Sequence, residues 1–123
     1  MLDFYHVDVF SKQALSGNGL SVFFKDRDLS SELMQKLTEE MRQFESIFLA
    51  STSSEKRFSA NIFTMEEELD FAGHPVLGAA CVLHERYCSS QNEAVWELEL
   101  KHKTVEVVTE RFDKWYKATM EQG

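Results

Sequence analysis

The segment 75–87 constrains the fold most, because it reads as a helix that is apolar nearly all round. Proline suits the first turn of a helix, and the run Val-Leu-Gly-Ala-Ala-Cys-Val-Leu follows it directly. A helix with apolar residues on most faces is buried on most faces. The small residues Gly78, Ala79 and Ala80 let strands approach its axis closely. The rest of the chain must therefore enclose this helix.

Much of the remaining sequence alternates as strands do and can supply that enclosure. Six or seven strands are predicted, at residues 2–10, 20–24, 46–50, 57–64, 94–100, 104–109 and around 115–120. The turn signal at 16–19 favours an antiparallel pairing of the first two. Both faces of the first strand are largely apolar, so we expect it to lie inside the fold. The prediction is an α+β fold, a mixed and mainly antiparallel sheet wrapped around a central helix.

A second helix is predicted from about residue 30 to Arg42. Ser30 is a good N-cap, and Glu32 in the first turn favours the helix dipole. Apolar residues repeat at helical spacing, with Met34 alongside: Leu33, Leu37, Met41 and Phe44. Residues 51–54 form a polar turn, and the acidic stretch 65–69 is predicted to be a surface connection.

Composition bounds the class of protein and its partners. With 123 residues, 43% of them hydrophobic and only one Pro, the chain fits a single packed domain. The formal net charge is −8 and no segment concentrates Lys or Arg, so neither nucleic acid nor an anionic membrane is an expected partner. The N-terminus has no charged leader, and no stretch approaches the roughly 18 apolar residues of a membrane span. The expectation is a cytoplasmic protein.

The Cys and His residues show no metal or redox pattern. Cys81 and Cys88 are seven apart, which fits neither a CxxC motif nor a zinc pair, so both are expected to be reduced thiols, with Cys81 in the core. His6, His84 and His102 are scattered. We therefore expect neither a metal site nor a cofactor.

Glu45 is the first candidate functional residue, because it stands at the entry to a strand among Phe44, Ile47 and Phe48. Desolvation in such surroundings raises the pKa of a carboxyl group, which is what proton transfer near neutral pH requires. The alternative is a helix-end carboxylate exposed to water. Its neighbour Ser46 lacks the GxSxG context of a hydrolase nucleophile.

His74 is the second candidate, since it stands at the start of the apolar helix. Gly73 allows the backbone to come close to a ligand, and the free N–H groups from Val76 onward can bind a carboxylate. The alternative is that His74 is an N-cap and nothing more. The turn at 16–19 lacks the features of a phosphate-binding loop, which leaves Asn18 as a possible ligand contact.

Taken in order along the chain, four features resemble the PhzF-like proteins of phenazine biosynthesis, which share the diaminopimelate-epimerase fold. They are the opening strand 5–10, the Ser16-Gly17-Asn18 turn, the Glu45-Ser46-Ile47-Phe48 segment, and Phe63-Thr64 followed by Phe71-Ala72-Gly73-His74-Pro75. The last is the most specific. The resemblance covers almost the whole chain and thins after about residue 90.

The resemblance implies a cofactor-independent proton transfer that isomerises or epimerises a small carboxylic acid. Glu45 matches the family's acid/base, while Gly73 and His74 match its substrate-binding helix start, with Asn18 as a further contact. In the related epimerases a cysteine precedes this glycine. Ala72 stands there in this chain, so the resemblance leaves Glu45 as the proton carrier.

The family usually has two similar lobes with the active site between them, and residues 1–123 resemble the N-terminal lobe alone. We therefore expect activity to require a second lobe, from another copy in a homodimer or from another chain. Two alternatives stay open. One is a catalytically silent lobe that binds a ligand or a protein, and the other is a hotdog-like thioesterase, for which the sequence offers no acyl-CoA motif.

Overall fold

The computed structural model describes residues 3–9, 18–25, 28–41, 45–112 and 116–121. These residues form eight strands and two helices. The strands are β1 (Asp3–Val9), β2 (Asn18–Phe24), β3 (Glu45–Ser51), β4 (Arg57–Thr64), β5 (Glu68–Leu69), β6 (Glu93–Glu99), β7 (Thr104–Arg111) and β8 (Tyr116–Glu121). The helices are α1 (Ser31–Met41) and α2 (Gly73–Tyr87).

The strands form one curled sheet in the order β1-β2-β3-β4-β6-β7-β8, with β5 paired to β4 beside this path. The pairs β2–β3 and β4–β6 are parallel and the others are antiparallel, which confirms the predicted mixed sheet. The expectation that the first strand lies inside the fold is wrong. Within the described sheet β1 pairs only with β2, so it is an edge strand, and its Tyr5 is exposed.

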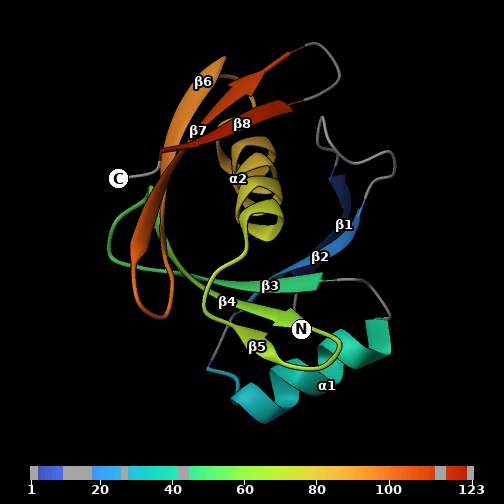
Figure 1. Cartoon of the computed structure of the whole chain (residues 1–123). Coiled ribbons are helices and arrows are strands. Elements are labelled where there is room, and N and C mark those ends of the chain that lie inside the picture. Colours follow the sequence, from blue (N-terminus) through green and yellow to red (C-terminus); the bar gives the residue numbers. More distant parts are fainter. Residues whose placement is uncertain (1–2, 10–17, 26–27, 42–44, 113–115, 122–123) are drawn as a thin grey trace.

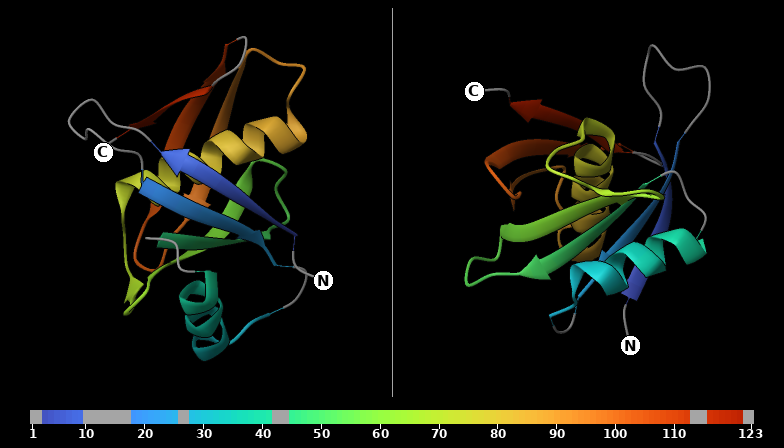
Figure 2. Two further views of the ribbon diagram at one scale, coloured as in Figure 1. Left: turned by 90° about the vertical axis from the view of Figure 1, so that its right-hand side faces the viewer. Right: turned by 60° about the horizontal axis from the view of Figure 1, so that its bottom comes forward.

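The sheet wraps around α2, as the apolar character of this helix predicted (Figures 1 and 2). The helix contacts β1, β2 and β3 on one side and β6, β7 and β8 on the other. Val76, Ala79, Ala80 and Leu83 are fully buried, and they pack into a core that contains Trp96. Small side chains on α2 thus leave room for large ones on the strands.

Helix α1 lies outside the curled sheet and packs against β3 and β4 (Figure 2). The Ser30 hydroxyl accepts a hydrogen bond from the Leu33 N–H at 3.1 Å, as expected of an N-cap. The buried side of the helix carries Met34 and Thr38, whereas Leu33 is 41% exposed. The predicted apolar side is therefore wrong in including Leu33, and Phe44 lies outside the described residues.

Two further expectations need correction. The connection 65–69 contains the short strand β5, whose Leu69 pairs with Ile62. Cys81 is partly exposed, so the buried thiol is that of Cys88. Both thiols are free, and none of the helices in the described parts of the chain is long and apolar enough to cross a membrane.

Candidate active site

Glu45 is the first residue of β3, where it lies between Leu20 of β2 and Thr64 of β4. Successive side chains of a strand point to opposite faces, so Glu45 shares a face with Ile47 and Leu49. Those two residues pack in the core around α2. The β3 strand therefore directs the Glu45 carboxyl to the inner face of the sheet, toward the helix.

Burial decides the protonation behaviour of Glu45. The residue is only 7% exposed, so its interpretation as an exposed helix-end carboxylate is wrong. Burial raises the pKa of Glu45, and the positive charge of His74 opposes this effect and lowers it. The fold brings these two residues close enough to interact, although they lie 29 positions apart in the sequence, Glu45 on β3 and His74 on α2.

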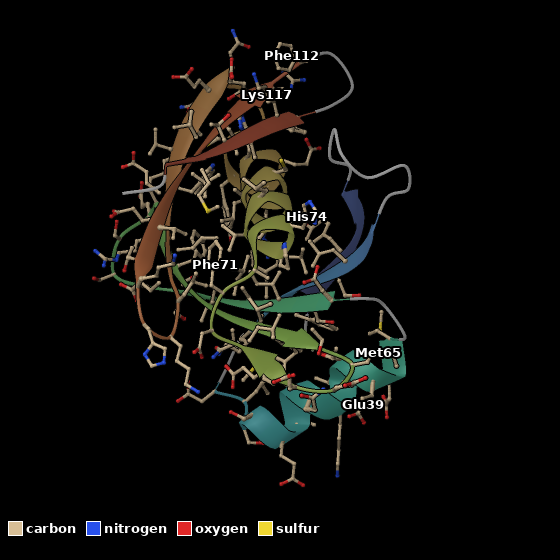
Figure 3. The ribbon with its side chains drawn as sticks, viewed as in Figure 1. Glu39, Met65, Phe71, His74, Phe112 and Lys117 are labelled. Atoms are coloured by element: carbon tan, nitrogen blue, oxygen red, sulfur yellow. The ribbon has the colours of Figure 1, made fainter. Side chains whose placement is uncertain are left out.

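His74 is the second residue of α2 and is half-buried. Figure 3 shows it on the first turn of the helix, on the side that faces β1 and β2. The N-cap is Ala72, which has an extended backbone at φ −154° and ψ 132° and makes no side-chain capping hydrogen bond. The interpretation of His74 as the N-cap is therefore wrong.

The start of α2 has the features of an anion site. The first N–H groups of a helix have no acceptor within the helix, and Ala72 has no side-chain oxygen to serve them. Pro75 contributes no N–H, so the donors here are Gly73, His74 and Val76. A Cβ built on Gly73 would meet no heavy atom within 4 Å, so the backbone is approachable at this point. The helix dipole favours negative charge at the same place.

Two contacts that the sequence did not predict position the loop before α2. His102 Nε2 lies 3.5 Å from an Asp70 carboxylate oxygen, and Lys103 Nζ lies 4.1 Å from the centre of the Phe71 ring. Both partners come from the turn between β6 and β7, toward which Phe71 points in Figure 3. The β6–β7 turn thereby contacts the residues that lead into Gly73 and His74.

The other residues considered as site candidates have different outcomes. Asn18 begins β2 opposite Val9, but its side chain and residues 16–17 lie outside the described part of the chain, so its ligand contact stays a prediction. Residues 45–112 and the other described ranges contain no cluster of three or more His, Cys, Asp or Glu able to hold a metal ion. His84 is a core residue: its Nδ1 lies 2.8 Å from Thr109 Oγ1 and its Nε2 lies 2.7 Å from the Gln91 carbonyl oxygen.

Comparison with known proteins shows the family of this chain. The model of the phenazine biosynthesis-like protein family, PhzC-PhzF, matches residues 7–123. The chain belongs to this family. The family and its fold are those that the Gly73-His74 and Glu45 segments suggested, and they exclude the hotdog-like interpretation.

Three known members are similar to this chain. The trans-2,3-dihydro-3-hydroxyanthranilate isomerase of Pseudomonas aeruginosa is 43% identical over 77 residues, which are 63% of this chain and 28% of that protein. The uncharacterized isomerase YddE of Escherichia coli K12 is 31% identical over 121 residues, which are 97% of this chain and 39% of that protein. A solved structure described as a predicted epimerase of P. aeruginosa superposes with a TM-score of 0.85 at 45% identity over 95% of this chain and 41% of its own. The chain therefore spans about two fifths or less of the length of these relatives.

Proposed function

We propose that this chain forms one half of an isomerase site that moves a proton between carbon atoms of a small carboxylic acid. The observation that carries the proposal is the buried Glu45 carboxyl beside His74 at the uncapped start of α2. A carboxyl group whose pKa is raised by burial holds its proton closer to neutral pH and can both deliver and accept it. Glu45 is the proton carrier.

The substrate's carboxylate binds at the start of α2. The N–H groups of Gly73 and Val76 and the helix dipole stabilise its negative charge, and the His74 side chain contacts the substrate from the same turn. Asn18 adds a further contact. Charge that develops on the carboxylate side of the substrate as a C–H proton leaves is stabilised by these same donors. No cofactor takes part in this mechanism.

A second lobe completes the site. The proposal rests on the share of the relatives' length that this chain spans, 28% to 41% in the three compared above. The missing part of the cleft comes from another copy of the chain in a homodimer, or from a complementary lobe. The named substrate of the P. aeruginosa relative, trans-2,3-dihydro-3-hydroxyanthranilate, is the first candidate substrate. The site operates in the cytoplasm.

Solvent deuterium incorporation tests this proposal. The protein, as a homodimer or together with its complementary lobe, is incubated with trans-2,3-dihydro-3-hydroxyanthranilate in D2O. Deuterium in the recovered acid is then measured by mass spectrometry. Glu45→Gln keeps the size of the side chain and removes the base, so we expect the rate to fall by about 100-fold or more. The matched control is Glu39→Gln, since Glu39 is exposed on α1 (Figure 3). A Glu45→Gln protein that incorporates label as fast as the Glu39→Gln protein overturns the assignment.

The second candidate function is that of a catalytically silent lobe. The small share of the relatives' length that this chain spans supports this candidate as much as it supports the isomerase. Light scattering over a dilution series separates the two. A stable dimer that incorporates deuterium supports the isomerase. A monomer at all concentrations that incorporates none supports a lobe that binds a ligand or a protein.

A further inference from the structure

A pocket of about 600 Å³ lies at the opposite end of α2 from Glu45 and His74. Its lining comes from the turn between β3 and β4, the start of β4 and the residues that end α2. Because α2 has 15 residues, about 22 Å separate its two ends. The volume falls within the range of about 300 to 1,000 Å³ that is usual for small-ligand pockets. Nothing in the proposed isomerase mechanism uses it.

Lys56 and Cys88 meet in the lining of this pocket. Lys56 Nζ donates a hydrogen bond to Cys88 Sγ at 2.7 Å, although the two residues are 32 positions apart. The ammonium group also lies 4.6 Å from the centre of the Trp96 ring, a cation–π contact that helps to hold it in place. Cys88 is equally well fixed, because its N–H donates to the His84 carbonyl at 2.9 Å and its carbonyl accepts from the Gln91 N–H at 2.8 Å.

Charge and burial around the sulfur of Cys88 bear on its reactivity. The thiolate, not the thiol, attacks electrophiles, and an adjacent cation stabilises it. Cys88 caps the C-terminal end of α2, where the helix dipole is negative and acts against a thiolate, and the burial of Cys88 acts in the same direction. Glu55 also lines the pocket, but it is exposed to solvent. Lys56, in direct contact with the sulfur, is the group in the lining whose charge favours a thiolate.

We propose that Cys88 is a site of reversible thiol modification by a small polar disulfide, with Lys56 as its activating residue and the pocket as the binding site of the incoming group. Cys88 is 7% exposed and lines the pocket, so the reagent approaches the sulfur through it. Hydroxyl groups of Ser51, Ser53 and Ser54 in the same lining suit the amide and carboxylate groups of a short peptide.

The exchange step is balanced without a further oxidant. The Cys88 thiolate attacks one sulfur of the disulfide, so that a new S–S bond forms at Sγ and the S–S bond of the reagent breaks. The departing thiolate takes up the proton that Cys88 lost. Cys88 is oxidised to a mixed disulfide and half of the reagent is reduced to a thiol, so a reducing agent restores the starting protein.

Cys81 provides an internal control, because it lies on α2 of the same molecule and its pKa is shifted by burial rather than by a neighbouring charge. Burial raises the pKa of the Cys81 thiol to about 11, which leaves it mostly protonated near neutral pH. Both cysteines experience the same reagent, the same pH and the same folded state. The ratio of their rates therefore reports on local environment alone.

The experiment treats the folded protein with oxidised glutathione and measures modification of each cysteine over time by peptide mass spectrometry. Three proteins are compared: wild type, Lys56→Met and Lys56→Arg. In the wild type we expect Cys88 to be modified first and dithiothreitol to reverse the change. Lys56→Met is expected to slow Cys88 by about tenfold, and Lys56→Arg to keep most of the rate because it keeps the charge.

Each outcome decides the proposal. The proposal is supported if Cys88 reacts faster than Cys81 in the wild type and if Lys56→Met, but not Lys56→Arg, slows the reaction of Cys88. Equal or slower reaction of Cys88 in the wild type overturns it, and this comparison needs no variant to fold. An unchanged Cys88 rate in Lys56→Met overturns the role of Lys56, provided that circular dichroism and an unchanged Cys81 rate show that the fold is intact.

Discussion

Thr109 on β7 offers a sharp test of how the core is held together. It is fully buried, and its Oγ1 accepts a hydrogen bond from Trp96 Nε1 at 3.0 Å. Its hydroxyl also lies 2.8 Å from Nδ1 of His84, which is buried as well. The other ring nitrogen of His84 lies 2.7 Å from a carbonyl oxygen, which can only accept. We therefore assign the proton to Nε2, and the single proton of the Thr109 hydroxyl to the contact with Nδ1 at 2.8 Å rather than to the Ala94 carbonyl oxygen at 3.4 Å.

Thr109→Val keeps the shape of the side chain and removes both hydrogen bonds. The indole N–H of Trp96 and Nδ1 of His84 are then buried without these partners. Each buried polar group left unsatisfied costs about 1 to 3 kcal/mol, so the free energy of unfolding should fall by about 2 to 6 kcal/mol. That is a large part of the roughly 5 to 15 kcal/mol that is typical of a domain.

Urea unfolding followed by tryptophan fluorescence measures this loss. The matched control is Thr119→Val on β8, where the side chain is exposed and the same change should alter stability by no more than about 0.5 kcal/mol. The reasoning is refuted if Thr109→Val and Thr119→Val have the same free energy of unfolding within error.

Two further predictions concern the start of α2 and the carboxyl beside it. Burial raises the pKa of Glu45, so the folded state binds this proton more tightly than the unfolded chain, and the resulting stability is present at acid pH and lost as pH rises through the folded pKa. Glu45→Gln should therefore unfold at a higher urea concentration than wild type near pH 8, and a gap that widens toward pH 4 contradicts this. Gly73→Ala should leave stability unchanged or raise it by up to about 1 kcal/mol, because the added Cβ meets no heavy atom within 4 Å, yet it should slow deuterium incorporation by covering the backbone of the carboxylate site. A thermal melt that shows clear destabilisation, or an unchanged incorporation rate, counts against the role given to Gly73.

Local patterns predicted the fold where one face of an element is buried. A strand was predicted at residues 57–64 because the segment alternates, and in β4 the alternate residues Phe58, Ala60 and Ile62 are all buried in the core around α2. The same reasoning missed β5, because a strand of two residues exists only through its pairing with β4 and has no period of its own. It also placed Leu33 on the buried side of α1, because helical spacing defines the edge of the apolar side only to within one residue.

The candidate site was predictable residue by residue but not as an arrangement. Glu45 and His74 stand out because each is a titratable group in apolar sequence. Their proximity depends on how β3 packs against α2, which no local pattern encodes. The contacts of His102 with Asp70 and of Lys56 with Cys88 join residues about 30 positions apart, so the scattered His residues and the cysteine spacing gave no sign of them.

The position of α2 in the chain has a consequence for biosynthesis. The helix is apolar on most faces, yet β6, β7 and β8, which cover one side of it, are the last strands of this sequence to leave the ribosome. At typical synthesis rates of about 5 to 20 residues per second, some seconds pass before that cover exists. During this interval Ala80 and Leu83 belong to a nascent chain with an unpaired sheet edge at β4. Exposed apolar surface and an unpaired strand edge both favour aggregation, so this interval is the one in which the chain is most exposed to it.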